Sequence, residues 1–127
     1  DMLTVEGYPG YKEWFAQGGT ALCEYWEWFE HADSKNHHMY SDFMSWLVQN
    51  VVGIKADYKE IKVSPYYFAK LDYAKGSYDT ENGKVEVCWK RNDGKITLSI
   101  VVPENILVYY DNNELKAGEN KFVVEEK

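Results

Sequence analysis

A carboxylate with no evident structural purpose stands in the segment Gly18-Gly19-Thr20-Ala21-Leu22-Cys23-Glu24-Tyr25-Trp26. The two glycines and Thr20 predict a tight turn that opens a helix, with Thr20 as its N-cap. Glu24 then lies in the first helical turn, one residue beyond the position that would close a capping box. Its aromatic neighbours in the sequence are Tyr25, Trp26, Trp28 and Phe29. Because aromatic rings pack on the apolar face of sugars, this setting suits a carboxylate that acts on a carbohydrate or on a water beside one. The helix dipole alone also favours glutamate in a first turn, so a purely structural role stays open.

Cys23 offers a second kind of chemistry beside this carboxylate. A nucleophilic cysteine needs a base, and the histidines of the chain are His31, His37 and His38. None of them stands in a context typical of a Cys–His pair, so this alternative is disfavoured. The second cysteine, Cys88, lies in a segment assigned to a different element, and no CxxC or His-x-x-x-His spacing indicates a metal site. We therefore expect no disulfide, no metal and no cofactor.

The first half of the sequence predicts the helices that must position these residues. Tyr11 to Ala16 form a short helix, and Leu22 to Glu30 form a second one with aromatic residues on two faces. The strongest pattern runs from His37 to Val52, where apolar residues recur at spacings of three and four. Asn36 suits the N-cap of this helix, and Gly53 suits the residue after its end.

The second half predicts antiparallel strands. The expected strands are Ile61–Ser64, Leu71–Thr80, Lys84–Arg91, Ile96–Val102, Ile106–Tyr110 and Lys121–Val124. In two of them the apolar residues alternate, as in half-buried strands: Val85, Val87 and Trp89, then Ile96, Leu98, Ile100 and Val102. Asn82-Gly83 predicts a type I′ hairpin turn, and Asp93-Gly94 predicts a second turn. Closely spaced turns of this kind are typical of a sandwich or meander.

The periodicity changes from helical to extended between Gly53 and Tyr58, and we place a domain boundary there. The predicted domains are residues 1–56 and residues 57–127. The expected fold class is α+β, with a short N-terminal helical segment followed by an antiparallel β-sandwich.

Composition limits the partners of the chain. The net charge of −7 and a pI near 4.9 argue against nucleic acid, because binding phosphates needs clustered Lys and Arg. Aromatic residues make up 17% of the chain, which indicates a carbohydrate-facing surface or an interface cut open. No apolar run approaches about 18 residues, so no membrane span is expected. The chain opens on Asp1-Met2-Leu3 in mid-pattern, without a signal peptide, which indicates a piece of a longer protein and leaves its compartment unknown.

Three segments resemble the C-terminal part of the bacterial α-L-rhamnosidases. They are Tyr8-Pro9-Gly10-Tyr11, the segment Gly18 to Trp26, and Asn36-His37-His38-Met39-Tyr40. In that family a Gly-(Ala/Gly)-Thr-x-x-x-Glu-x-Trp motif ends the catalytic helical barrel, and an Asn-His pair opens its last long helix. Val52-Gly53-Ile54 and the β-rich tail are similar as well, so the resemblance covers nearly the whole chain. It implies that residues 1–56 are the last helices of an (α/α)6 barrel.

The resemblance implies an inverting glycosidase. In such enzymes an acid protonates the leaving oxygen, while a base activates water on the opposite face of the sugar ring. Glu24 matches the general base, and His37 matches a histidine that contacts the rhamnose in the −1 subsite. The substrate of the parent enzyme would be a rhamnose-containing oligosaccharide or glycoside. The structural alternative for His37 is a residue of the first helical turn, and His38 is expected to be structural.

The chain departs from the family pattern in two respects. Cys23 stands where the family often has Trp, and Ala21 stands where it often has Thr, which leaves substrate contact at Cys23 in doubt. More importantly, the segment that carries the general acid in the family is absent. The nearest carboxylates in the sequence, Glu27, Asp33 and Asp42, do not match that segment and are interpreted as solvated helix residues. We therefore expect the isolated chain to be inactive.

Two further functional classes stay open. The sandwich could be a non-catalytic carbohydrate-binding module that uses Tyr66-Tyr67-Phe68 or Tyr109-Tyr110 as stacking platforms, although packing in a core or interface is the favoured role of these pairs. It could also be a structural cap that shields the end of the helical barrel. The helix His37–Val52 carries Met39 and Trp46 opposite its main apolar face, an excess that would be buried in an intact barrel. In this chain alone, the same excess predicts self-association.

Overall fold

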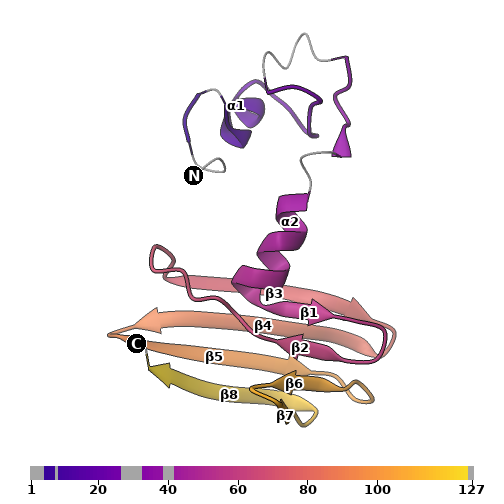
Figure 1. Cartoon of the computed structure of the whole chain (residues 1–127), viewed down its shortest axis with the longest axis vertical. Helices are drawn as coiled ribbons and strands as arrows, with labels where there is room; N and C mark the ends of the chain where they lie inside the picture. The colour runs from indigo at the N-terminus through magenta and orange to yellow at the C-terminus, as the bar shows by residue number, and fades with distance from the viewer. Residues whose placement is uncertain (1–4, 8, 27–32, 39–41, 126–127) are drawn as a thin grey trace. The chain divides into compact units, whose positions relative to one another are not determined.

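The computed structural model describes residues 5–7, 9–26, 33–38 and 42–125. The chain forms two compact units, Asp1–Met44 and Ser45–Lys127, and each is described by itself. The described part of the first unit is mainly irregular, with a short helix near its start, and the second unit holds two β-sheets (Figure 1). This arrangement confirms the α+β class with a β-sandwich after a helical segment. The domain boundary after residue 56 stays a prediction.

The first unit is built around helix α1, Tyr11–Ala16, as predicted. Tyr11 and Trp14, three residues apart on one face, are its buried residues. The helix stops at Gly18, whose φ of +81° is the left-handed conformation that glycine adopts without strain. The amides of Gly18 and Gly19 donate to carbonyls of the last turn, at 3.0 and 2.8 Å, and so cap the helix.

The predicted helix from Leu22 to Glu30 is wrong for the part that the structure describes. Residues 22–26 have no helical hydrogen bonds and form an irregular extended segment, while residues 27–30 lie outside the described residues. The Glu24 amide donates to the Ser34 carbonyl instead, at 3.0 Å. Aromatic side chains have low helix propensity, and here the ring of Trp26 stacks on Trp14, so tertiary packing outweighs a weak local preference.

The long predicted helix is confirmed over its second part. Helix α2, Asp42–Trp46, continues into a π-helical segment, η3, Leu47–Val52. His37 is not helical, so Asn36 does not cap a helix that starts there, and residues 39–41 lie outside the described residues. Gly53 ends the segment as predicted, with φ +88°, and its amide donates to Val48 at 2.9 Å. A side chain at Gly53 would also meet the backbone of Pro65, so only glycine fits.

The second unit contains two four-stranded sheets. One has the order β1 (Ile54–Ala56), β2 (Ile61–Val63), β6 (Val108–Tyr110) and β7 (Asn113–Glu114). The other has the order β3 (Tyr73–Thr80), β4 (Gly83–Asn92), β5 (Lys95–Val102) and β8 (Gly118–Glu125). Neighbouring strands are antiparallel, except that β2 and β6 are parallel, a pairing that the sequence did not predict. Figure 1 shows the shorter strands lying over the longer sheet.

The core lies between the two sheets. The residues predicted to alternate into it are buried: Val85, Val87, Trp89, Ile96, Leu98, Ile100 and Val102. The shorter sheet contributes Ile54, Ile61, Val63 and Val108 to the same core. The indole of Trp89 donates to the carbonyl of Val51 at 2.8 Å, which satisfies one of the carbonyls left over at the end of η3.

The two hairpin turns behave differently. Asp93 and Gly94 have positive φ, +48° and +75°, and join paired residues of β4 and β5, which confirms the predicted turn. The type I′ turn predicted at Asn82-Gly83 is wrong, because Thr80 pairs with Gly83 and the turn residues are Glu81 and Asn82. The Thr80 hydroxyl explains the shift, since it donates to the Gly83 carbonyl at 2.6 Å and accepts from the Asn82 amide at 3.3 Å.

Candidate functional site

The residues that the sequence singled out, Glu24 and His37, lie on two neighbouring irregular segments of the first unit. The amide of Glu24 donates to the carbonyl of Ser34 at 3.0 Å, and the amide of His37 donates to the carbonyl of Leu22 at 2.8 Å. From Leu22 to Glu24 the bonded partner moves back along the chain from His37 to Ser34. The two segments therefore run antiparallel to each other, as neighbouring antiparallel strands do. The structure therefore brings the backbone that carries Glu24 beside the backbone that carries His37.

Cys23 anchors the segment that carries Glu24. It is fully buried, in a small core with Tyr11 and Trp14, and Leu22, Trp26 and Phe43 pack against this core. The rings of Trp14 and Trp26 are stacked with centroids 4.6 Å apart. Buried Cys23 precedes Glu24, and the stacked, half-buried Trp26 follows two residues later, so both fix the backbone around Glu24 while its residue stays partly exposed.

The environment of Cys23 does not favour a nucleophile. Burial raises the pKa of its thiol, and the positive charge of Lys35 opposes this only in part. The reactive form of cysteine is the thiolate, which a raised pKa makes scarce at neutral pH. Both cysteines of the chain, Cys23 and Cys88, are free thiols. Cys23 therefore acts as a small apolar residue that fixes the loop.

The structural explanations offered for Glu24 and His37 do not hold in the described residues. Glu24 is not in a helix, so no helix dipole accounts for a carboxylate there. His37 is not in the first turn of a helix either, and it is partly exposed. The rings of His37 and His38 lie nearly parallel with centroids 6.0 Å apart. A partly exposed carboxylate can accept a proton from water, and a partly exposed imidazole can donate a hydrogen bond to a hydroxyl.

The nearest carboxylates of the first unit were interpreted from the sequence as solvated. Asp33 and Asp42 are exposed, and Glu27 lies outside the described residues. Among the residues that the structure describes, no three His, Cys, Asp or Glu side chains are grouped to hold a metal ion. The helices of the described part are too short or too polar to cross a membrane.

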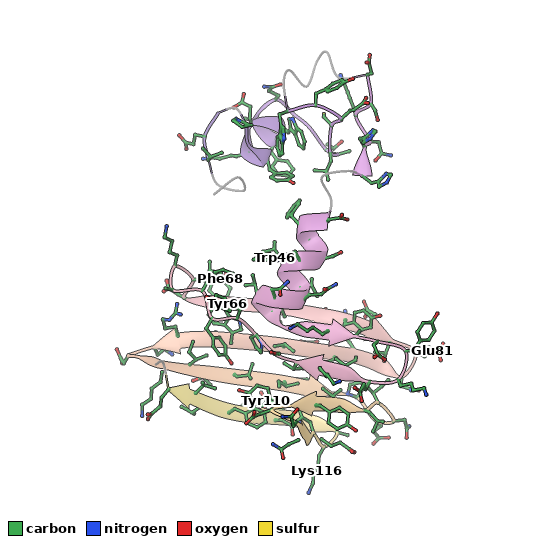
Figure 2. The ribbon with its side chains drawn as sticks, viewed as in Figure 1. Trp46, Tyr66, Phe68, Glu81, Tyr110 and Lys116 are labelled. Carbon is green, nitrogen blue, oxygen red and sulfur yellow. The ribbon has the colours of Figure 1, made fainter. Side chains whose placement is uncertain are left out.

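The aromatic pairs of the sandwich have divided roles. Tyr67 packs edge-on against buried Trp89 with centroids 5.4 Å apart, and Tyr110 packs against Phe122 at 4.6 Å, as expected for core residues. Tyr66, by contrast, is 63% exposed and contacts Phe68. Figure 2 shows Tyr66 and Phe68 near Trp46 and well away from Tyr110.

A hollow on the sandwich was missed by the sequence analysis. It has a volume of about 950 Å³ and is lined partly by β1 and by the ends of β2 and β6. The lysines that line it, Lys55 and Lys62, were not predicted to have a role. No local pattern could have identified them, because β1 has three residues and the pairing of β2 with β6 joins distant parts of the chain.

Comparison with known families matches the chain in two consecutive parts. Residues 1–51 match the bacterial alpha-L-rhamnosidase 6 hairpin glycosidase domain, and residues 51–109 match the bacterial alpha-L-rhamnosidase C-terminal domain. The two matches define the class of protein: the chain joins part of a six-hairpin glycosidase domain to the C-terminal domain of the same family. The chain belongs to the bacterial α-L-rhamnosidase family.

Individual relatives agree with this assignment. An alpha-L-rhamnosidase of Formosa agariphila is 30% identical over 137 aligned positions, which cover 95% of this chain and 15% of the relative. One from Alteromonas sp. (strain LOR) is 27% identical over 84% of this chain and 13% of the relative. The solved alpha-L-rhamnosidase of Dictyoglumus thermophilum shares the fold with a TM-score of 0.80, at 21% identity over 98% of this chain and 18% of that one. The chain thus spans roughly one seventh of the length of the curated relatives it matches.

Proposed function

We propose that this chain supplies the base-carrying end of the catalytic barrel of an α-L-rhamnosidase together with the β-sandwich that follows it. In this proposal residues 1–56 carry the end of the barrel and residues 57–127 carry the sandwich, whose shorter sheet also takes in β1, Ile54–Ala56. The complete enzyme hydrolyses terminal α-L-rhamnosides with inversion, and its substrate is a rhamnose-containing oligosaccharide or glycoside. The family match over residues 1–109 supports this reaction class.

In this proposal Glu24 is the general base. Its carboxylate orients the attacking water and takes its proton, while His37 donates a hydrogen bond to a hydroxyl of the rhamnose. The observation that carries the proposal is the pair of backbone hydrogen bonds that sets the Glu24 segment beside the His37 segment. Buried Cys23 and stacked Trp26 hold that segment in place, which is what a positioned base requires.

The chain by itself is inactive in this proposal, because the general acid belongs to a segment that it does not contain. In an inverting enzyme the acid and the base stand roughly 6.5–9.5 Å apart, with sugar and water between them. A base without its acid leaves the aryl or sugar oxygen to depart unprotonated, which is slow.

A kinetic comparison in the complete enzyme tests the role of Glu24. Glu24→Gln is expected to lower kcat by at least about 10²-fold, with a much smaller change in KM, because the residue acts on water rather than on the sugar. Glu13→Gln is the matched control, since Glu13 lies on α1 and its carboxylate accepts a hydrogen bond from Gln17 at 2.8 Å. Near-normal kcat in Glu24→Gln would refute the assignment.

We also propose that the exposed apolar side chains of α2 drive self-association of the chain. Met44 and Trp46 are 55% and 50% exposed, which is unusual for large apolar residues on a short helix. In the complete enzyme the same surface would be covered by other helices of the barrel.

A further inference from the structure

The hollow on the sandwich lies entirely within the second unit. It is lined by Lys55, Glu60, Lys62, Val63, Ser64, Pro65, Tyr67, Tyr109, Tyr110, Asp111 and Asn112. Its volume of about 950 Å³ is in the range of pockets that bind small ligands. No residue of this hollow belongs to the segments that carry Glu24 and His37.

The register of the shorter sheet sets a row of side chains on its outer face. Lys55 pairs with Lys62, and Lys62 pairs with Tyr109 across the parallel strands. Residues before and after them, such as Ile61 and Val63, are buried on the opposite face. Lys55, Lys62 and Tyr109 therefore lie side by side and face outward.

The parallel pairing of β2 with β6 closes one end of this row. Because both strands run in the same direction, the chain leaves them at the same edge of the sheet. Ser64 and Pro65 follow β2, and Asp111 and Asn112 follow β6, so both exits line the hollow. Asp111 and Asn112 form a tight turn with positive φ, +49° and +60°, which the Asn113 side chain holds by donating to the Asp111 carbonyl at 2.9 Å.

Two tyrosines that pack on the core also line the hollow. Tyr67 rests on Trp89 of the core, and Tyr110 rests on Phe122 of the longer sheet (Figure 2 labels Tyr110). The Tyr67 hydroxyl is buried and lacks a hydrogen bond of ordinary geometry among the described residues. Burial, aided by the neighbouring Tyr110 hydroxyl, raises the pKa of Tyr67, so the ring stays neutral at any physiological pH.

The charges around the hollow balance each other. Two lysines, Lys55 and Lys62, and two carboxylates, Glu60 and Asp111, line it. Lys62 and Glu60 form an ion pair of 2.6 Å, and this hydrogen bond raises the pKa of Lys62 and keeps it cationic. A strongly cationic ligand would be repelled by the two lysines, and a strongly anionic ligand would be repelled by the two carboxylates. The hollow therefore suits a neutral ligand with many hydrogen-bonding groups.

We propose that this hollow binds a pyranose unit of a neutral saccharide. Sugar hydroxyls both donate and accept, which matches a rim of ammonium, carboxylate and amide groups. The C–H face of the ring carries weak positive charge and fits the negative face of an aromatic ring, the role assigned to Tyr109. This site would hold the glycan through residues other than those that cut it, and the choice of rhamnose as the sugar rests on the function proposed above.

An NMR titration of the 127-residue chain tests this site. The probes are methyl α-L-rhamnoside and methyl α-D-glucoside, each taken to the tens of millimolar that weak sugar sites require, since a Kd near 1 mM corresponds to only about −4 kcal/mol. We expect the rhamnoside to shift the amide signals of Lys62, Tyr109 and Asn112. Tyr109→Ala should weaken binding about tenfold, and Lys55→Ala should weaken it measurably without touching the core. Tyr73→Ala, at a 65% exposed position on the other sheet, is the control and should leave binding unchanged.

The outcomes separate this site from the proposed active site. Shifts at Lys62 and Asn112 that need higher sugar concentrations in both variants, in spectra that remain dispersed, support the pocket whether or not Glu24 responds. A response to the glucoside alone supports a saccharide site and removes its link to rhamnose. Shifts confined to residues near Glu24 and His37, or no shifts with either sugar, would overturn the proposal.

Discussion

Trp89 links the end of the helical segment to the core of the sandwich, and its replacement by phenylalanine should be costly. The residue is fully buried, and its indole donates to the Val51 carbonyl at 2.8 Å. Phe cannot donate, so Trp89→Phe leaves a buried carbonyl unsatisfied, at a cost of about 1–3 kcal/mol. The smaller ring also leaves a cavity beneath Tyr67, which adds about 1–2 kcal/mol. The expected loss is about 2–5 kcal/mol, a large part of the 5–15 kcal/mol that stabilises a typical domain.

Urea unfolding followed by far-ultraviolet circular dichroism measures this loss. The midpoint should fall while the m-value stays the same, because the surface exposed on unfolding hardly changes. Trp46→Phe is the matched control: Trp46 is 50% exposed, and its replacement should change the free energy of unfolding by no more than about 0.5 kcal/mol. A Trp89→Phe variant within 0.5 kcal/mol of the parent would show that the hydrogen bond and the packing described here contribute little.

Three further predictions concern the chain alone. It should not hydrolyse an aryl α-L-rhamnoside at a measurable rate, since loss of a positioned acid costs about 10²–10⁴ in rate; robust turnover that Glu24→Gln abolishes would contradict this. A thiol reagent such as DTNB should label half-buried Cys88 at least about tenfold faster than buried Cys23, with Cys88→Ser to assign the two phases; equal rates would show that the core around Cys23 is open. In sedimentation velocity the chain should associate with rising concentration, and Met44→Lys with Trp46→Lys should make it monomeric; a monomer without these changes would remove the case for self-association.

The strands could be predicted because their signals are local. Val85, Val87 and Trp89 alternate with polar residues, and burial of one sheet face follows directly from that alternation. The prediction of a helix from Leu22 was wrong because the aromatic residues of this segment do not follow the 3.6-residue period of one helix face. In the structure the ring of Trp26 stacks on Trp14, and local sequence patterns do not predict a contact between residues this far apart. The strands β1 and β7 were missed because two or three residues carry too little pattern.

The candidate site was predictable only in part, for a related reason. Glu24 and His37 were found through a family motif, but the proximity of their backbone segments depends on hydrogen bonds between residues that are ten to fifteen positions apart. The hollow on the sandwich depends on a parallel pairing between β2 and β6, which are more than forty residues apart in the chain. Both sites depend on contacts between distant parts of the chain, which the periodicity of the sequence does not predict.

Rescue of a disabled base by azide tests the central claim most directly. In the complete enzyme, Glu24→Ala removes the group that activates water and leaves space for a small anion that needs no base. With an activated aryl α-L-rhamnoside, azide should restore part of the lost turnover, and the product should be the β-L-rhamnosyl azide that inversion requires. The same anion should leave the Glu13→Ala control unchanged. Absence of rescue, or an α-configured azide, would contradict the assignment of Glu24 as the general base of an inverting α-L-rhamnosidase.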